Sequence, residues 1–178
     1  MPAALDIPVI KNARAFHLKR WRDICNDAYY QSVEGKVETN CFGQVIMMPP
    51  PGFSHSDRQG TILQHLTKLM PSGRSLPEVA VLTSDGVKGV DVVWISEARI
   101  KKGLAADVLT IAPEICIEVF SPSNTRNEID EKKQLYFAAG AEEVWICDRS
   151  GRVHFFLKKS PNRAVKSSAL CPEMAGKV

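Results

Sequence analysis

The sequence lacks the features that mark membrane proteins, secreted proteins and cysteine-ligated zinc proteins. No run of about 18 apolar residues is present, which excludes an ordinary membrane-spanning helix. The N-terminus, from Met1 to Asp6, has neither the basic start nor the apolar core of a secretory signal. The 5 cysteines are scattered and none forms a Cys-x-x-Cys pair, so zinc is not expected. We therefore expect a protein of the reducing cytoplasm.

A strong net charge is missing as well. The 23 basic and 20 acidic side chains give +3 at pH 7, whereas a protein that binds nucleic acid by itself usually has a larger basic excess. This charge leaves room for a homodimer, or for a partner protein that supplies affinity. What is present is an ordinary globular composition, 44% apolar and 24% charged. We expect residues 1–178 to form one domain with a substantial core.

Two short apolar runs each carry one carboxylate. Asp91 begins the run 91–95, and Glu118 lies within the run 115–120. Their valine and isoleucine content predicts buried strands. A carboxylate in a buried strand is costly unless something pairs with it. If the two strands are neighbours, Asp91 and Glu118 can meet at one point and offer the oxygen ligands that a hard divalent cation requires.

The remaining segments alternate between helical and extended patterns. Apolar residues at helical spacing predict a helix over 12–31, and Thr125 with Glu128 forms a capping box that begins a helix ending near Ala139. Residues 97–112 are expected to be loop-like, and 158–178 are expected to form a weakly structured tail with one possible last strand. A hairpin is expected at 33–48, a helix at 54–70, and strands at 78–83, 142–148 and 153–157. This order predicts an α/β fold in which helices flank a mixed central sheet.

The helix over 125–139 carries a lysine where an apolar residue is expected. At about 100° per residue, Lys132 falls in the middle of the apolar stripe and Lys133 at its margin. A lysine on a core-facing stripe must reach solvent or meet a negative charge. Glu118, near the end of the preceding strand, is the nearest candidate partner, and Glu128, four residues earlier on the helix, is the alternative.

Asp91, Glu118 and Lys132 together suit phosphodiester hydrolysis. Mg²⁺ held by two carboxylates polarises a phosphate and lowers the pKa of a bound water. A lysine beside that water orients it and offsets the developing charge. The same spacing also fits a metal-free structural domain, in which Lys132 neutralises a buried pair of acids.

From residue 34 to about 156 the chain resembles the Uma two family of restriction-endonuclease-like proteins, which belongs to the PD-(D/E)xK nuclease superfamily. The segment from Glu118 to Asp148 is the most specific part. The matching stretches are Val37-Glu38, Gly43 to Pro49, His55, Val90 to Val93, Glu118 to Ser123, Lys132, Leu135-Tyr136 and Gly140 to Asp148.

The resemblance implies a restriction-endonuclease-like core and a DNA endonuclease that uses Mg²⁺, with Mn²⁺ as a substitute. It implies that Asp91 and Glu118 are metal ligands, that Lys132 is the motif lysine moved onto the helix, and that Glu38 is a further acidic site residue. Phe120 departs from the pattern, because the superfamily motif has lysine there on the same strand face as Glu118. The site therefore depends on a lysine from elsewhere.

Alternatives remain open for two of these residues and for the function. Glu38 also fits an exposed position on the hairpin, and His55 fits either a contact with phosphate or water, or a structural place at a helix start. A catalytically inactive nuclease fold that binds nucleic acid or a protein partner is the alternative function, because a fold alone does not define an activity.

Overall fold

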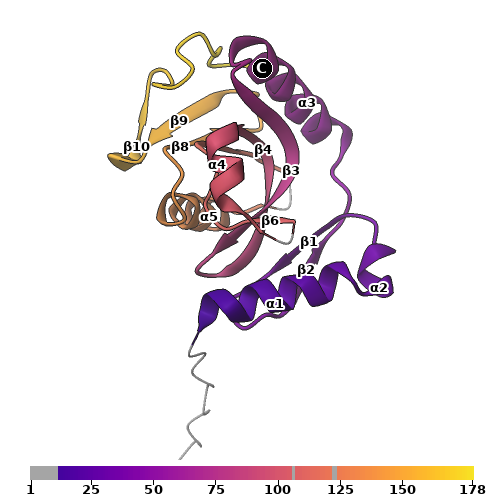
Figure 1. The fold of residues 1–178 in the computed structure, drawn as a ribbon. Helices are drawn as coiled ribbons and strands as arrows, with labels where there is room; N and C mark the ends of the chain where they lie inside the picture. Colours follow the sequence, from indigo (N-terminus) through magenta and orange to yellow (C-terminus); the bar gives the residue numbers. More distant parts are fainter. Residues whose placement is uncertain (1–11, 106, 122–123) are drawn as a thin grey trace, which may run out of the picture.

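The computed structural model describes residues 12–105, 107–121 and 124–178. A large mixed sheet forms the centre of the molecule (Figure 1). The helices are α1 (Ala13–Cys25), α2 (Ala28–Gln31), α3 (Phe53–Leu69), α4 (Glu97–Gly103) and α5 (Arg126–Ala138). The strands are β1 (Lys36–Thr39), β2 (Val45–Met48), β3 (Gly73–Thr83), β4 (Gly86–Ser96), β5 (Leu104–Ala105), β6 (Val108–Leu109), β7 (Ile115–Val119), β8 (Glu143–Cys147), β9 (Val153–Leu157) and β10 (Ser160–Val165).

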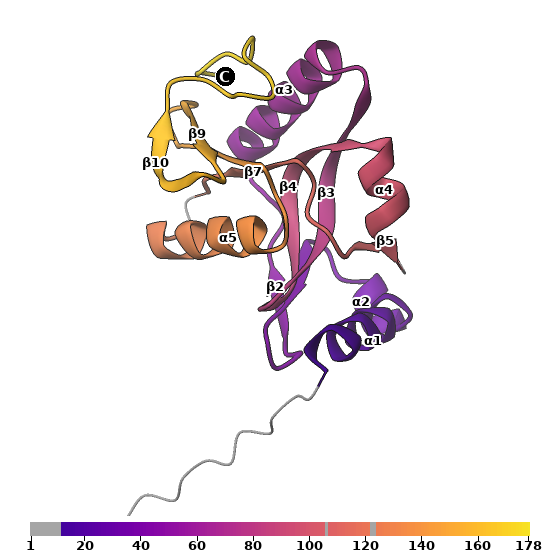
Figure 2. The same cartoon turned by 60° about the vertical axis from the view of Figure 1, so that its left-hand side comes forward.

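The large sheet has the strand order β10-β9-β8-β7-β4-β3-β6-β5. Two of its pairings, β7 with β8 and β3 with β6, are parallel, and the others are antiparallel. Helices α3 and α5 lie on opposite faces of this sheet (Figure 2). The prediction of a mixed sheet flanked by helices is confirmed.

Each face of the sheet has its own apolar core, because side chains alternate along a strand. Val92 and Ile117 point to the side of α3, where they pack with Ile62 and Leu66. Val93 and Cys116 point to the side of α5, where they pack with residues of that helix. By the same alternation, Asp91 and Glu118 belong to the α5 side of the sheet.

The register of β4 and β7 brings Asp91 and Glu118 to the same place. Val92 of β4 is paired with Ile117 of β7. Asp91 directly precedes Val92 and Glu118 directly follows Ile117, so the two acids lie opposite each other across the antiparallel strands. Opposite residues of an antiparallel pair point to the same face. The prediction that both carboxylate-bearing runs are buried strands is confirmed, and the pairing of β4 with β7 meets the condition that they are neighbours.

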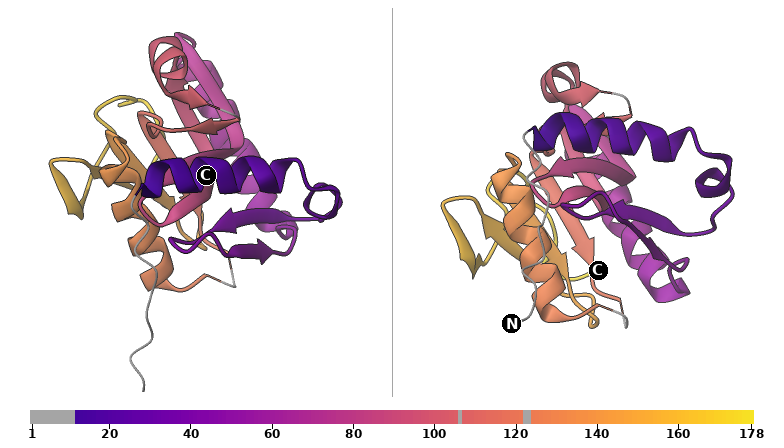
Figure 3. Two further views of the ribbon diagram at one scale, coloured as in Figure 1. Left: turned by 60° about the horizontal axis from the view of Figure 1, so that its bottom comes forward. Right: turned by 90° about the horizontal axis from the view of Figure 1, so that it is seen from below.

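The N-terminal hairpin β1–β2 and the helices α1 and α2 form a separate layer against the β3–β4 end of the sheet (Figure 3). Trp21 and Ile24 of α1 pack there on Leu82 and Val87. The prediction of one helix over 12–31 is wrong, because the helix ends at Cys25 and α2 begins at Ala28. The Asp27 side chain accepts a hydrogen bond from the Tyr29 amide and caps a new helix at the break.

The loop expected over 97–112 is also wrong. Ser96 caps α4 by accepting the Arg99 amide, and β5 and β6 then extend the sheet edge beside β3. The last strand considered for the tail is present as β10, which pairs with β9. Beyond it, Cys171 and Met174 are buried in the core on the α3 side, so this part of the tail packs on the domain. Among the described helices, none combines the length and apolar content that a membrane span requires.

Candidate active site

The four side chains predicted for the site, Glu38, Asp91, Glu118 and Lys132, lie together at one end of β4 and β7. They come from three strands and a helix, β1, β4, β7 and α5. Lys132 Nζ lies 2.6 Å from Glu38 Oε1 and 3.8 Å from Glu118 Oε2. The described ion pairs of Lys132 do not include Glu128, the alternative partner on its own helix.

The two central carboxylates are buried and fixed by hydrogen bonds. Asp91 and Glu118 are each only 3% exposed. Asp91 Oδ2 accepts the backbone N–H of Val119 at 2.8 Å, and Glu118 Oε1 accepts the Tyr136 hydroxyl at 2.6 Å. Hydrogen bonds of this kind fix the orientation of a buried carboxylate and stabilise it. The strands therefore present two preoriented acids on the α5 side of the sheet.

Burial raises the pKa of Glu118 from 4.5 to about 7. This pKa is the net result, because the charge of Asp91 adds to the effect of burial while Lys132, Lys36 and the Tyr136 hydrogen bond oppose it. The pKa of Lys132 is raised, because Glu118 and Glu38 favour its charged form more strongly than burial disfavours it. Glu118 consequently holds a proton in part of the molecules near neutral pH when no added cation is bound.

Glu38 is not exposed on the hairpin, which was one of its two expected positions. It is buried, and its Oε1 atom accepts both the Lys132 ammonium and the Gly89 amide, the latter at 3.0 Å. Glu38 thus ties the hairpin to β4 and holds the end of the Lys132 side chain beside Glu118.

The helical phase predicted for α5 is partly wrong. Lys133, expected at the margin of the apolar stripe, is 4% exposed, and the side chain of Lys132 is 16% exposed at the edge of the site. The Lys133 ammonium lies 4.2 Å above the Phe156 ring and pairs with Asp130 at 2.7 Å. Lys133 therefore extends away from the carboxylates, and Lys132 is the helix lysine that reaches them.

Lys36 is a further site residue, which was not predicted from the sequence. Its ammonium pairs with Asp91, lies 3.1 Å from Glu78 Oε2, and donates to the Gly89 carbonyl at 3.1 Å. Lys36 precedes Glu38 by two residues, so strand alternation was the available signal that both point to one face. The ammonium occupies a position between two carboxylates, which is a position that suits a cation.

Glu78 is the second unexpected residue, and its backbone is strained. It lies in β3 with φ of 52°, a left-handed conformation that non-glycine residues seldom adopt. The Gln59 side chain donates to Glu78 Oε1 and to the Asp91 carbonyl, both at 2.9 Å. No local sequence pattern signals this conformation, because it depends on pairing between β3 and β4.

His55 lies at the site rather than capping α3. Its Nε2 atom is 3.6 Å from Asp91 Oδ2, and one ligand atom from each of His55, Glu78 and Asp91 falls within 4.8 Å of the others. His55 Nδ1 is buried and has no hydrogen-bond partner within the described parts of the chain. These residues form a His–carboxylate cluster that suits a divalent metal ion.

The site opens into a cavity of about 800 Å³. Lys36, Asp91, Glu118, Lys132 and His55 line it. Phe120 does not line this cavity but a second one of about 520 Å³ with Arg126 and Arg149. Phe120 packs against the apolar core on the α5 side, so the position that would hold the superfamily lysine brings no cation to the first cavity.

Comparisons with known proteins find similarity to nuclease-like proteins. Residues 26–170 match the protein family Uma2, whose description is "Putative restriction endonuclease". A solved structure, the crystal structure of a putative nuclease belonging to DUF820 from Anabaena variabilis, is similar with a TM-score of 0.63. Its sequence is 19% identical, and the match covers 84% of this chain and 92% of that one, which shows a shared fold.

No curated protein matches the chain. The family match is the broader finding, because it spans most of the sequence and includes every residue of the site described above. It confirms the resemblance found in the sequence and the restriction-endonuclease-like fold. The chain belongs to the Uma2 family, a family of restriction-endonuclease-like proteins.

Proposed function

We propose that this protein is a Mg²⁺-dependent endonuclease that hydrolyses DNA phosphodiester bonds, with Mn²⁺ as an alternative cation. The observation that carries the proposal is that Asp91, Glu118 and Lys132 line one cavity, with Glu38 holding the Lys132 ammonium. A purely structural ion cluster has no need of a cavity beside it. The nuclease-like family supports a nucleic acid as the substrate.

The acids of this site fit a divalent cation. Asp91 and Glu118 are the proposed metal ligands, and Glu78 and His55 offer further ligand atoms beside Asp91. The Lys36 ammonium between Asp91 and Glu78 supports this assignment, because it stands where positive charge is needed. A bound Mg²⁺ would polarise the phosphodiester and lower the pKa of a water ligand.

Lys132 is the proposed catalytic lysine. Its ammonium is held by Glu38 and lies near Glu118, so it can donate to the attacking water or to a phosphate oxygen. Glu38 fixes the position of that ammonium and is the fourth member of the proposed catalytic set. Because Glu118 and Glu38 raise the pKa of Lys132, the lysine keeps its charge throughout the physiological range.

The proposal also covers the oligomeric state, the cellular location and the domain organisation of the protein. The net charge of +3 suits a homodimer that doubles the contact with DNA, or a partner that adds affinity. We also place the protein in the cytoplasm, and treat residues 1–178 as one domain with the N-terminal helices and the C-terminal tail attached to its core.

Cleavage assays test the proposal. Supercoiled plasmid and single-stranded DNA are incubated with the protein in Mg²⁺, in Mn²⁺ and in EDTA. Cleavage should require the metal, and it should fall by about 100-fold or more in Asp91→Asn and Lys132→Met. Lys133→Met is the matched control, because Lys133 lies on the same helix and points away from the carboxylates.

Two results would contradict the proposal. Loss of activity in Lys133→Met but not in Lys132→Met would show that Lys132 is not the catalytic lysine. Metal binding by calorimetry without cleavage of either DNA would support the alternative, a catalytically inactive nuclease fold that binds nucleic acid or a protein partner.

A further inference from the structure

Much of the cavity beside the carboxylates is apolar. We use the name apolar lobe for the part lined by Trp21, Tyr30, Val33, Val37, Met48 and Pro50. These residues come from α1, α2, the hairpin β1–β2 and the segments on either side of it, which lie together on one side of the molecule (Figures 1 and 3). The same cavity reaches Asp91, Glu118 and Lys132, so the apolar and charged parts are continuous.

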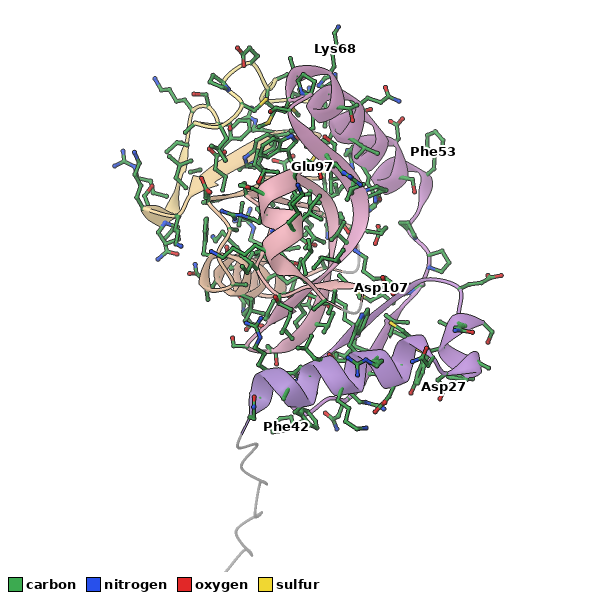
Figure 4. All side chains as sticks on the ribbon, in the orientation of Figure 1. Asp27, Phe42, Phe53, Lys68, Glu97 and Asp107 are labelled. Carbon is green, nitrogen blue, oxygen red and sulfur yellow. The ribbon has the colours of Figure 1, made fainter. Side chains whose placement is uncertain are left out.

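The aromatic rings of the lobe differ from the aromatic rings elsewhere on the surface. Trp21 is 9% exposed and Tyr30 is half-buried, and both line the cavity. Phe42 and Phe53 project from the hairpin turn and from the start of α3 (Figure 4), and neither lines it. Rings held in the wall of a cavity offer a rigid surface on which a flat ligand can stack.

Trp21 also carries an unused hydrogen-bond donor. Its indole Nε1 is buried and finds no acceptor within the described parts of the chain. A buried donor normally has a partner, because an unsatisfied polar group destabilises the fold. Because this nitrogen has no accessible surface, Trp21 contributes the apolar part of its side chain to the lobe.

We propose that the apolar lobe binds one unpaired nucleobase of the strand whose phosphodiester lies at the charged end. This inference rests on the proposed function and names its substrate class, DNA that is single-stranded, frayed or flapped. A volume of about 800 Å³ suits one ligand of nucleotide size. A flat heteroaromatic base offers a face that stacks on Tyr30 and packs against the Trp21 side chain.

Fully paired duplex is the disfavoured substrate for the same reason. A base inside a duplex is stacked and paired, so it must be taken out of the helix before it can enter the lobe. A single strand does not need this step. The cation at the charged end would then bind the phosphate of a nucleotide, and the lobe would bind the base of the same nucleotide.

The test measures binding without cleavage. Wild-type protein in Ca²⁺ is titrated by fluorescence anisotropy into a labelled thymidine 20-mer and into a blunt duplex of equal length, at the same salt concentration. The single strand should bind about 10-fold more tightly or better, as expected for one stacked base. A single 2-aminopurine in the strand should lose fluorescence on binding.

Matched variants locate the base. Tyr30→Ala should weaken single-strand binding by about 10-fold and leave duplex binding unchanged, because it removes one stacking surface. Trp21→Phe keeps a smaller ring in the wall of the lobe, so it should give a smaller loss than Tyr30→Ala. Tyr29→Ala is the control, since Tyr29 is 61% exposed and outside the cavity lining.

The outcomes separate this inference from the nuclease proposal. Strand preference that depends on Tyr30, in a protein that cuts no DNA, would support the lobe and refute only the activity. Metal-dependent cleavage with equal binding of both DNAs and no effect of Tyr30→Ala would refute only the lobe. Absence of binding to either DNA would overturn the lobe assignment as well.

Discussion

The protonation of Glu118 should set how the stability of the metal-free protein depends on pH. Its pKa is raised from 4.5 to about 7 in the folded state, mainly by burial. The folded protein therefore keeps a proton that the unfolded chain releases above pH 4.5. The contribution of this group to stability is complete below about pH 4.5 and is lost as the pH rises through about 7.

The magnitude follows from the difference between the two pKa values. One pKa unit corresponds to about 1.4 kcal/mol, so the rise from 4.5 to about 7 amounts to about 3 kcal/mol. Glu118→Gln has nearly the same shape and keeps an oxygen that can accept the Tyr136 hydroxyl, but it cannot ionise. Relative to the wild type, this variant should gain about 3 kcal/mol of unfolding free energy between pH 4.5 and pH 8.

Urea denaturation in EDTA, followed by tryptophan fluorescence at several pH values, measures this gain. The difference between the two proteins at each pH removes the contribution of the other titrating groups. A difference that stays constant from about pH 4.5 to pH 8 would refute the reasoning. So would a wild type that becomes more stable than the variant as the pH rises, because Lys132 and Lys36 would then outweigh burial.

Three further predictions concern the network around Glu118 and the C-terminal tail. Lys36→Met should raise Mn²⁺ affinity by about 10-fold, measured by calorimetry at pH 7, because the ammonium on Asp91 no longer competes; unchanged or weaker binding would contradict this. Tyr136→Phe should lower unfolding free energy by about 1–3 kcal/mol and raise the pKa of Glu118 further, read from carboxyl NMR titration. Glu143→Gln should speed proteolysis of residues 158–178, because the buried carboxylate accepts two backbone N–H groups of the tail; equal cleavage rates would show that apolar packing alone holds it.

The strands that carry the site could be predicted because the residues that determine them lie within each short segment. Valine and isoleucine surround Asp91 and Glu118, and such runs form buried strands wherever they pack. The capping box of Thr125 and Glu128 likewise fixes the start of α5 and is present in the structure. Helical spacing from that start brings Lys132 to the side of the carboxylates, but it does not predict that Lys133 is the more buried of the two lysines.

The residues that were missed depend on contacts between distant segments. Lys36 meets Asp91 only because the hairpin β1–β2 folds onto β4, 55 residues further along the chain. The left-handed backbone of Glu78 is a property of the paired sheet rather than of its own segment. Lys133 is buried with its ammonium against the face of the Phe156 ring of β9, a contact that no periodicity within α5 reveals.

A crystal of the full chain soaked in Mn²⁺ gives the most direct measurement of the central claim, that Asp91 and Glu118 share a divalent cation next to Lys132. An anomalous-scattering map locates the ion without reference to activity. We predict a peak about 2–2.5 Å from a carboxylate oxygen of both acids, with the Lys36 ammonium moved off Asp91. A peak confined to His55 and Glu78, or no peak at the site with Lys36 still on Asp91, would contradict the account.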